Sequence, residues 1–285
     1  MLREQLGLER ANASVWQELM GTYYGMVSRV DDQFGRIVNK TKEQNLWDST
    51  VTLFYTDHGE FLGDAHMVEK WPSGVSENLV HEPMVIGGAG LPQGAVFDEM
   101  AEMIDLVPTL LHLGGVNETY AHYGKSMVDG IHAAGRGEAL HHRDYSYTEG
   151  GFLLSDEPLL EQGPFPYDIK SAIQHNDTAL VGKSLSVRNK EWTYVYRLYE
   201  PDELYDRNDT KELHNLAAEP EYAHVRAMMH EVALHWLVST PMTIPWFVDE
   251  RRPEVQLPSP YEQYEDRCDG CEFNETWPGP GLPHD

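Results

Sequence analysis

The chain has 285 residues, of which 41% are hydrophobic and 11% aromatic, a composition typical of a globular protein with a substantial core. A formal net charge of −26 and the lack of any basic cluster argue against nucleic acid or an anionic membrane as a partner, because phosphate groups would be repelled. No apolar run approaches the roughly 20 residues of a membrane span, and no signal-peptide stretch opens the chain, so the compartment stays open.

The first predicted element is a long amphipathic helix over residues 14–42. Apolar residues recur there at steps of three and four and predict a core-facing stripe. Its members are Leu19, Tyr23, Met26, Val27, Val30, Phe34, Ile37 and Val38. The β-branched and aromatic run 51–55 then predicts a buried strand, and 83–86 predicts a second one after a loop rich in glycine, proline and charge. We expect both strands in a mainly parallel sheet, because a helix precedes the first and both faces are apolar.

A short helix is predicted from Asp105, a candidate N-cap, to the stop at Gly114 and Gly115, with Leu110, Leu111 and Leu113 facing inward. From about residue 141 aromatic-rich strands replace this alternation of helix and strand. Strands are expected at 143–149, in an antiparallel hairpin of 185–189 with 192–199, and at 203–206, and a helix at 220–238.

Three regions follow from this order of elements. Residues 1–140 are predicted to form an α/β layer, 141–250 a smaller α+β subdomain with an antiparallel sheet, and 251–285 an extended tail rich in proline and charge. The tail holds Cys268 and Cys271, which we interpret as a disulfide or two free thiols, since a zinc site needs about four ligands.

Asp57 and His58 directly follow the first predicted strand, at the edge where open α/β sheets bind ligands. A carboxylate oxygen and an imidazole nitrogen can share one divalent cation. The pair alone does not establish a site, because Asp57 could cap a turn and His58 could be an ordinary polar residue.

The wider string Thr56-Asp57-His58-Gly59-Glu60-Phe61-Leu62-Gly63-Asp64, with Lys70 twelve positions after His58, resembles the second metal-binding motif of the sulfatases in the alkaline phosphatase superfamily. Further segments resemble the family in the right order, namely residues 23–36, residues 105–111, and residues 203–206 together with 212–216. The resemblance implies an alkaline-phosphatase-like fold, here in part, and a metal-dependent hydrolase of sulfuric esters.

The same resemblance implies that Asp57 and His58 bind Ca²⁺, with Mg²⁺ as the alternative, and that Lys70 binds a sulfate oxygen. Lys70 and His66 are the candidate catalytic residues. The sequence departs from the family at Ala65, where histidine is frequent and His66 comes one position later, and at His81, where arginine is frequent. The implied substrate is a small-molecule or carbohydrate sulfate ester, and the oligomeric state stays open.

The largest departure concerns the nucleophile. Sulfatases use formylglycine made from Cys or Ser in a Cys/Ser-x-Pro-x-Arg string, and no such string occurs in the 285 residues. We therefore expect a truncated chain or partial gene product that has no sulfatase activity and that exposes an apolar face prone to association. Two alternatives stay open: a phospho- or phosphonate-ester hydrolase of the same superfamily, and a non-catalytic metal-binding remnant.

Overall fold

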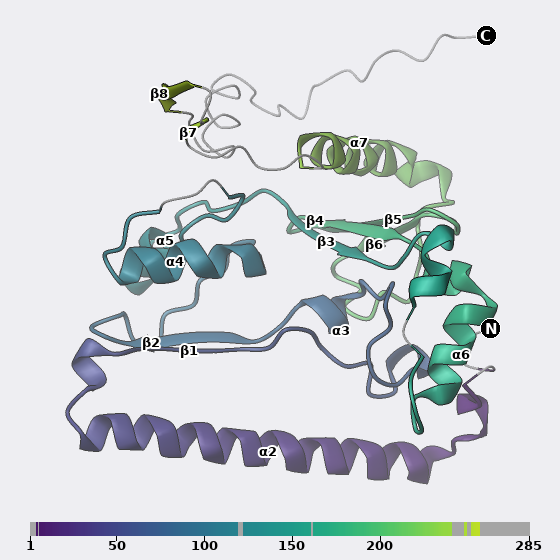
Figure 1. The fold of residues 1–285 in the computed structure, drawn as a ribbon, viewed down its shortest axis with the longest axis horizontal. Coiled ribbons are helices and arrows are strands. Elements are labelled where there is room, and N and C mark those ends of the chain that lie inside the picture. The colour runs from purple at the N-terminus through teal and green to yellow at the C-terminus, as the bar shows by residue number, and fades with distance from the viewer. Residues whose placement is uncertain are drawn as a thin grey trace.

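The computed structural model describes residue 4 and residues 6–118, 122–160, 162–240, 248–249 and 252–256. Its helices and strands alternate in a mixed α/β architecture (Figure 1). The helices are α2 (Ala13–Glu43), α3 (Glu77–Val80), α4 (Leu106–Leu113), α5 (Val128–Gly135), α6 (Asp168–Asn176) and α7 (Ala223–Ser239). The strands are β1 (Val51–Tyr55), β2 (Met84–Gly88), β3 (Ser146–Gly150), β4 (Ser184–Arg188), β5 (Trp192–Arg197), β6 (Glu203–Asp206), β7 (Val248–Asp249) and β8 (Arg252–Gln256).

Helix α2 confirms the predicted long helix and runs along one side of the molecule (Figure 1). Asn12 caps it, because its Oδ1 accepts hydrogen bonds from the backbone N–H groups of Ser14 and Val15 at 3.0 and 3.2 Å. The prediction that its apolar stripe faces the core is wrong for the most part, since α2 contains no buried residue. Phe34 contacts Phe54 of β1 at 5.2 Å between ring centroids, but the residues that stay at least half exposed include Met26, Val27, Val30 and Ile37.

The apolar stripe of α2 stays exposed because the helix is longer than the strands beside it. A helix of 31 residues is about 46 Å long, whereas a strand of five residues spans only about 17 Å. The two-stranded ribbon of β1 and β2 therefore covers only part of α2. Association through this exposed apolar face stays a prediction.

Strands β1 and β2 pair antiparallel, with Val51 opposite Gly88 and Tyr55 opposite Met84. The prediction that both are buried strands of a mainly parallel sheet is wrong for this pair. A parallel pair is usually joined by a crossover helix that packs on the sheet. The connection over residues 56–83 is long enough for one but contains only the 3-10 turn Asp64–His66 and the four-residue α3. Burial is also partial, because Val85 of β2 is 62% exposed.

Helix α4 begins after Asp105 and ends at Gly114, close to the predicted bounds. Its inward residues are Leu106, Pro108 and Thr109, whereas Leu110, which was expected inside, is 46% exposed. The Asp105 side chain does not cap α4. It is fully buried and accepts hydrogen bonds from more distant groups instead, as described below.

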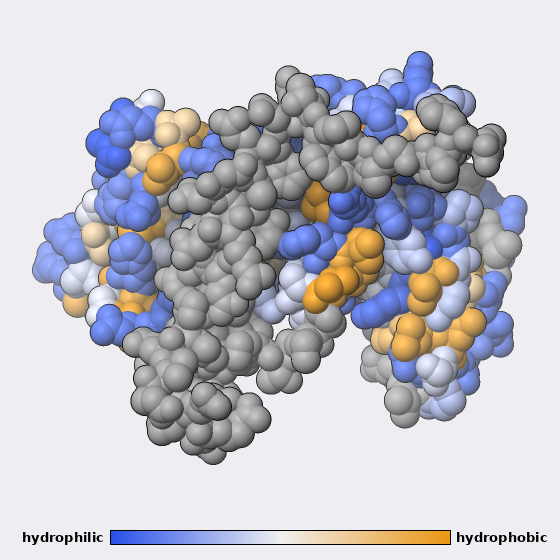
Figure 2. Space-filling view, turned by 90° about the horizontal axis from the view of Figure 1, so that it is seen from above, coloured by the Kyte–Doolittle hydropathy of each residue, from blue (hydrophilic) through white to orange (hydrophobic). Residues whose placement is uncertain are grey.

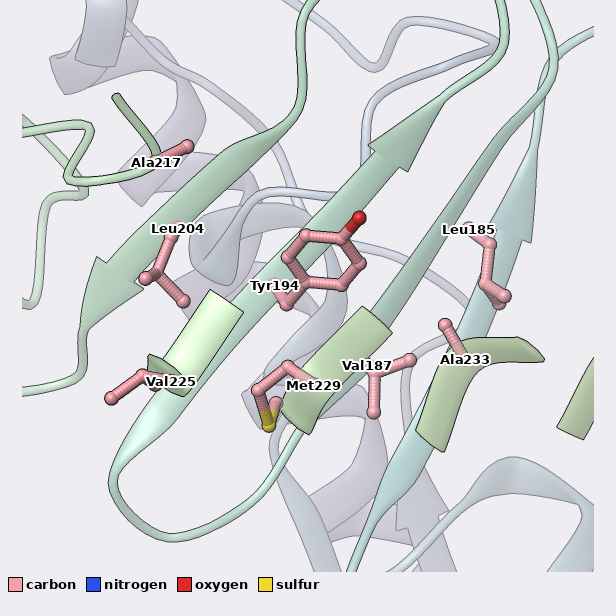
Figure 3. Packing of buried hydrophobic residues seen from close by; sticks show 8 residues of the cluster. All are labelled: Leu185, Val187, Tyr194, Leu204, Ala217, Val225, Met229 and Ala233. Atoms are coloured by element: carbon pink, nitrogen blue, oxygen red, sulfur yellow. The ribbon is translucent and has the colours of Figure 1, made fainter. Parts of the chain in front are cut away.

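The second half of the chain forms the antiparallel sheet β3-β4-β5-β6, which confirms the predicted hairpin of β4 and β5. Helix α7 packs on this sheet, and the buried residues between them form the main core (Figure 3). Its members are Leu185, Val187, Tyr194, Leu204, Ala217, Val225, Met229 and Ala233. Tyr147 of β3 stacks on Trp236 of α7 at 5.0 Å between ring centroids, which extends this core toward the edge of the sheet.

The face opposite α2 carries apolar patches that are interrupted by polar side chains (Figure 2). No helix in the described part of the chain combines the length and the apolar character of a membrane span. The predicted region limits at residues 140 and 250 stay predictions. Of the predicted tail, the described residues are those of β8, and Cys268 and Cys271 lie outside them.

Candidate metal and oxyanion site

A cleft of about 730 Å³ lies where the end of β1 and the loop after it face β3. Asp57 and His58 line it directly after β1, and the folded loop that follows them places Lys70 in the same lining. The cleft is also lined by apolar side chains from four segments, among them Tyr55, Met84, Phe97, Met100, Met103, Ile104 and Tyr147.

Asp57 and His58 present two donor atoms to one point. The His58 Nδ1 lies 2.8 Å from the carbonyl oxygen of Gly59. Because a carbonyl only accepts, Nδ1 carries the proton in the neutral imidazole, and Nε2 then keeps its lone pair. That Nε2 lies 3.7 Å from Oδ2 of Asp57, whose side chain is 82% exposed. The two atoms can therefore touch one cation at ligand distances of about 2.0–2.6 Å.

The residues present fit part of a divalent metal site. An oxygen anion and a neutral imidazole nitrogen are suitable donors, and the hydrogen bond to Gly59 fixes the ring as metal-binding histidines require. Within the described residues no group of three or more His, Cys, Asp and Glu side chains converges as a metal cluster. Asp57 and His58 could supply two ligands of such a site.

Gly59 sets the path of this loop. A Cβ at this position would lie 2.0 Å from the carbonyl oxygen of Asn78 and 2.5 Å from Oε1 of Glu82. The backbone N–H of Gly59 donates to the carbonyl of Leu79 at 3.0 Å, and the Thr56 hydroxyl donates to Glu82 at 2.5 Å. The loop after β1 is thus clamped against the segment that leads into β2.

Lys70 reaches the cleft at the end of a tightly folded loop. Backbone hydrogen bonds from Phe61 N to Glu69 O at 3.3 Å and from Gly63 N to Met67 O at 2.9 Å close this loop. Trp71, the next residue, is buried and its Nε1–H donates to the carbonyl of Leu180 at 2.7 Å. Lys70 therefore follows an ordered backbone, while its own side chain is exposed in the cleft.

The other candidate residues are placed differently. His66 lies in a 3-10 turn, Asp64–His66, is exposed, and is not among the residues that line the cleft. Its catalytic role stays a prediction that this placement does not favour. His81 does line the cleft, and its Nδ1 lies 2.8 Å from Oε1 of Glu77. That contact raises the pKa of His81, against the opposing effect of burial.

Sequence reasoning missed an ion-pair network of which Glu77, Arg188 and Arg207 line the cleft. Glu77 contacts Arg188 of β4 at 3.3 Å and Arg207 at 2.8 Å, and Arg188 also contacts Glu212 at 3.5 Å. Burial alone raises the pKa of Glu77. The hydrogen bonds from His81 and Arg207 and the two arginine charges outweigh it and lower the pKa to about 2. The available signal was Arg188 itself, a charged residue closing an otherwise uncharged strand.

A second buried network lies behind the opposite wall. Glu102 lines the cleft, accepts a hydrogen bond from Tyr147 N at 2.8 Å, and pairs with Arg143 at 3.1 Å. Burial dominates and raises the pKa of Glu102 to about 7. Asp105 accepts from Arg143 and from Lys125 N and lies 3.1 Å from His142. Burial raises the pKa of Asp105 as well, but the hydrogen bonds from Arg143 and His142 lower it to about 2.

The chain is similar to known sulfatases in sequence. The family profile described as Sulfatase matches residues 5–116. The multifunctional alkaline phosphatase superfamily protein PehA of Trinickia caryophylli is 27% identical over 232 residues, which are 78% of this chain and 41% of that protein. A sulfatase of Formosa agariphila is 30% identical over 117 residues, covering 41% of this chain and 23% of that protein.

Solved structures give the same answer for the fold. The phosphonate monoester hydrolase of Agrobacterium radiobacter superposes with a TM-score of 0.66 at 26% identity, over 87% of this chain and 47% of that one. The chain thus spans less than half the length of each of these relatives. The expected alkaline-phosphatase-like mixed α/β fold is confirmed. Members of the sulfatase family generally use a metal ion and formylglycine. Residues 5–116 thus match the sulfatase family, and similarity to a member of the alkaline phosphatase superfamily extends over most of the chain.

Proposed function

We propose that the chain forms the metal-binding and oxyanion-binding part of a hydrolase that acts on sulfuric esters. The observation that carries this proposal is the meeting of Asp57, His58 and Lys70 in one cleft, with Asp57 Oδ2 and His58 Nε2 only 3.7 Å apart. In a chain with a net charge of −26, an anionic ester needs local positive charge, and a divalent ion with a lysine supplies it.

Ca²⁺ fits the two donors better than Mg²⁺. Adjacent ligands of octahedral Mg²⁺ lie about 2.9 Å apart, whereas the longer bonds to Ca²⁺ put neighbouring ligands about 3.4 Å apart in a more flexible shell. The separation of 3.7 Å in the chain is closer to the second value. When bound, the ion acts as a Lewis acid that polarises an oxygen of the ester.

The residues of the chain divide the remaining work. Asp57 Oδ2 and His58 Nε2 hold the cation, and the carbonyl of Gly59 keeps the proton of His58 on Nδ1, away from it. The Lys70 ammonium donates hydrogen bonds to a second, non-bridging oxygen and stabilises the charge that develops there. The apolar wall contacts the leaving alcohol, which belongs to a small molecule or a sulfated carbohydrate.

The residues of the chain do not supply a nucleophile of the formylglycine type. Because the sequence contains no Cys/Ser-x-Pro-x-Arg string, the residues present do not fit a formylglycine, and no step through that group follows from them. We therefore propose that the chain by itself binds a metal ion and a sulfate ester but does not hydrolyse the ester. The alternative is a non-catalytic metal-binding remnant. It predicts that the chain binds a metal ion without binding sulfate.

A phosphonate- or phosphate-ester hydrolase is the second candidate. It is favoured by the likeness to the phosphonate monoester hydrolase of Agrobacterium radiobacter, at 26% identity and a TM-score of 0.66. A divalent ion and a lysine stabilise a phosphoryl oxygen as well as a sulfuryl oxygen. Competition between inorganic sulfate and phenylphosphonate for the chain separates the two, because the better fit binds more tightly.

The test of the metal site is calorimetric titration of Ca²⁺ into the wild-type chain, Asp57→Asn and Asp31→Asn. Asp31 is an exposed carboxylate on α2 and controls for the loss of one negative charge. We expect Asp57→Asn to weaken Ca²⁺ binding by at least about tenfold and Asp31→Asn to leave it unchanged. Equal Ca²⁺ affinities in all three proteins, or hydrolysis of 4-nitrophenyl sulfate by the wild-type chain, would contradict the proposal.

A further inference from the structure

Lys170 of α6 holds the backbone of the oxyanion-binding lysine from outside the cleft. Its Nζ lies 2.6 Å from the carbonyl oxygen of Lys70 and 2.8 Å from Oε2 of Glu69. The same ammonium lies 5.6 Å from the ring centroid of Trp71. One side chain, only 19% exposed, therefore contacts three consecutive residues of the loop that carries Lys70.

The loop needs such restraint because its backbone is strained. Four of its non-glycine residues have positive φ angles, which disfavour residues with a Cβ: Leu62 (47°), Ala65 (50°), His66 (58°) and Glu69 (60°). The carboxylate of Glu60 holds this turn from within by accepting hydrogen bonds from Leu62 N and Glu69 N. Lys170 is the matching contact from the C-terminal half, adjacent to the buried anchor Trp71.

We propose that Lys170 is a positioning residue for Lys70. It fixes the carbonyl of Lys70 and the carboxylate of Glu69, and thereby aims the Lys70 side chain into the cleft. Lys170 is not among the residues that line the cleft, so it acts through Lys70 and does not bind the anion itself. This inference rests on the proposed role of Lys70 in binding a sulfate oxygen.

The chemistry of the contact makes a clear distinction between substitutions. An ammonium donates to two oxygens at once, and an arginine guanidinium can also donate to both. A methionine preserves the length and the apolar stem but donates nothing. Lys211 offers a matched control: it is 64% exposed and pairs with Asp64 of the same loop at 3.3 Å, so its replacement removes the same charge and a loop contact without touching the backbone of Lys70.

The experiment measures inorganic sulfate binding by calorimetry at saturating Ca²⁺ for the wild type, Lys170→Met, Lys170→Arg and Lys211→Met. We expect the dissociation constant of sulfate to rise about tenfold in Lys170→Met and to change less than about twofold in Lys170→Arg and Lys211→Met. Glu69→Gln, which weakens one of the two contacts without touching Lys170, is expected to raise it about threefold. The affinity for Ca²⁺ is expected to stay unchanged in all of them.

Hydrogen exchange at the amides of Glu69, Lys70 and Trp71 provides a second reading that does not depend on sulfate. We expect faster exchange there in Lys170→Met, with the rest of the chain unchanged, which also shows that the variant folds. Equal sulfate affinity in Lys170→Met and Lys211→Met would overturn the inference, as would failure of Lys170→Arg to retain binding. Unchanged exchange in Lys170→Met would overturn it too. If the wild type binds no sulfate but exchange is faster in Lys170→Met, only the proposed function is refuted.

Discussion

Replacing Gly59 by alanine tests whether the loop after β1 is as tightly clamped as the site requires. The new Cβ would lie 2.0 Å from the carbonyl oxygen of Asn78, far inside van der Waals contact, and that oxygen belongs to backbone that cannot rotate away. Overpacking of this kind costs about 1–3 kcal/mol of unfolding free energy, and we expect a value near the upper end. The hydrogen bond from Gly59 N to Leu79 O would be displaced as well.

The matched control is Gly25→Ala on the exposed side of α2, where a Cβ meets nothing within 4 Å. Removing a glycine from a helix interior stabilises it by up to about 1 kcal/mol, so this variant is expected to be slightly more stable than the wild type. Urea unfolding followed by tryptophan fluorescence measures both, and Ca²⁺ titration is expected to show weaker binding in Gly59→Ala alone. A Gly59→Ala protein with wild-type stability and Ca²⁺ affinity would refute the clamped geometry of the site.

Three further predictions concern the networks and the core. Because the pKa of Glu77 is lowered from 4.5 to about 2, the unfolded chain binds more protons than the folded chain between these pH values. The stabilisation from Glu77 is therefore present above pH 4.5 and is lost as the pH falls toward 2. In Glu77→Gln, we expect the free energy of unfolding to fall by about 2–3 kcal/mol less than in the wild type across this range. The opposite sign holds for Glu102, whose pKa is raised to about 7, so its contribution to stability falls as the pH rises from 4.5 to 7. Glu102→Gln keeps an acceptor for Tyr147 N and is expected to remove this fall, which urea unfolding at pH 5 and pH 8 measures. In the core, Met229→Ala is expected to lower the free energy of unfolding by about 2–5 kcal/mol, because Met229 is fully buried. The neighbouring Met228 is 41% exposed, and Met228→Ala is expected to lower it by less than about 1 kcal/mol. Equal losses in chemical denaturation would contradict the packing of α7 on the sheet.

The elements that sequence predicted well are those whose pattern is local. Helix α2 and the β4-β5 hairpin follow from periodicities of about 3.6 and 2 residues, and they occur close to the expected bounds. The direction in which β1 and β2 pair is not written in either strand. It depends on the connection between them, which contains only short helical turns, so the expectation of a mainly parallel sheet was wrong for this pair.

The same distinction applies to the site. Asp57 and His58 are adjacent in the chain and Lys70 is twelve positions away, so one motif indicated all three. Arg188 and Arg207 reach Glu77 from more than 100 positions away, and such long-range ion pairs leave no spacing pattern. Lys170, exactly 100 positions from Lys70, was missed for the same reason.

The central claim is that Asp57 and His58 hold a divalent cation that faces the same anion as Lys70. The most direct test measures the dissociation constant of inorganic sulfate with and without Ca²⁺ for the wild type, Asp57→Asn and Lys70→Met. Because coupling between two sites is reciprocal, we predict that Ca²⁺ strengthens sulfate binding at least about tenfold in the wild type, that Asp57→Asn loses this gain, and that Lys70→Met weakens sulfate binding while still binding Ca²⁺. Sulfate binding that is independent of both Ca²⁺ and Lys70 would contradict the account.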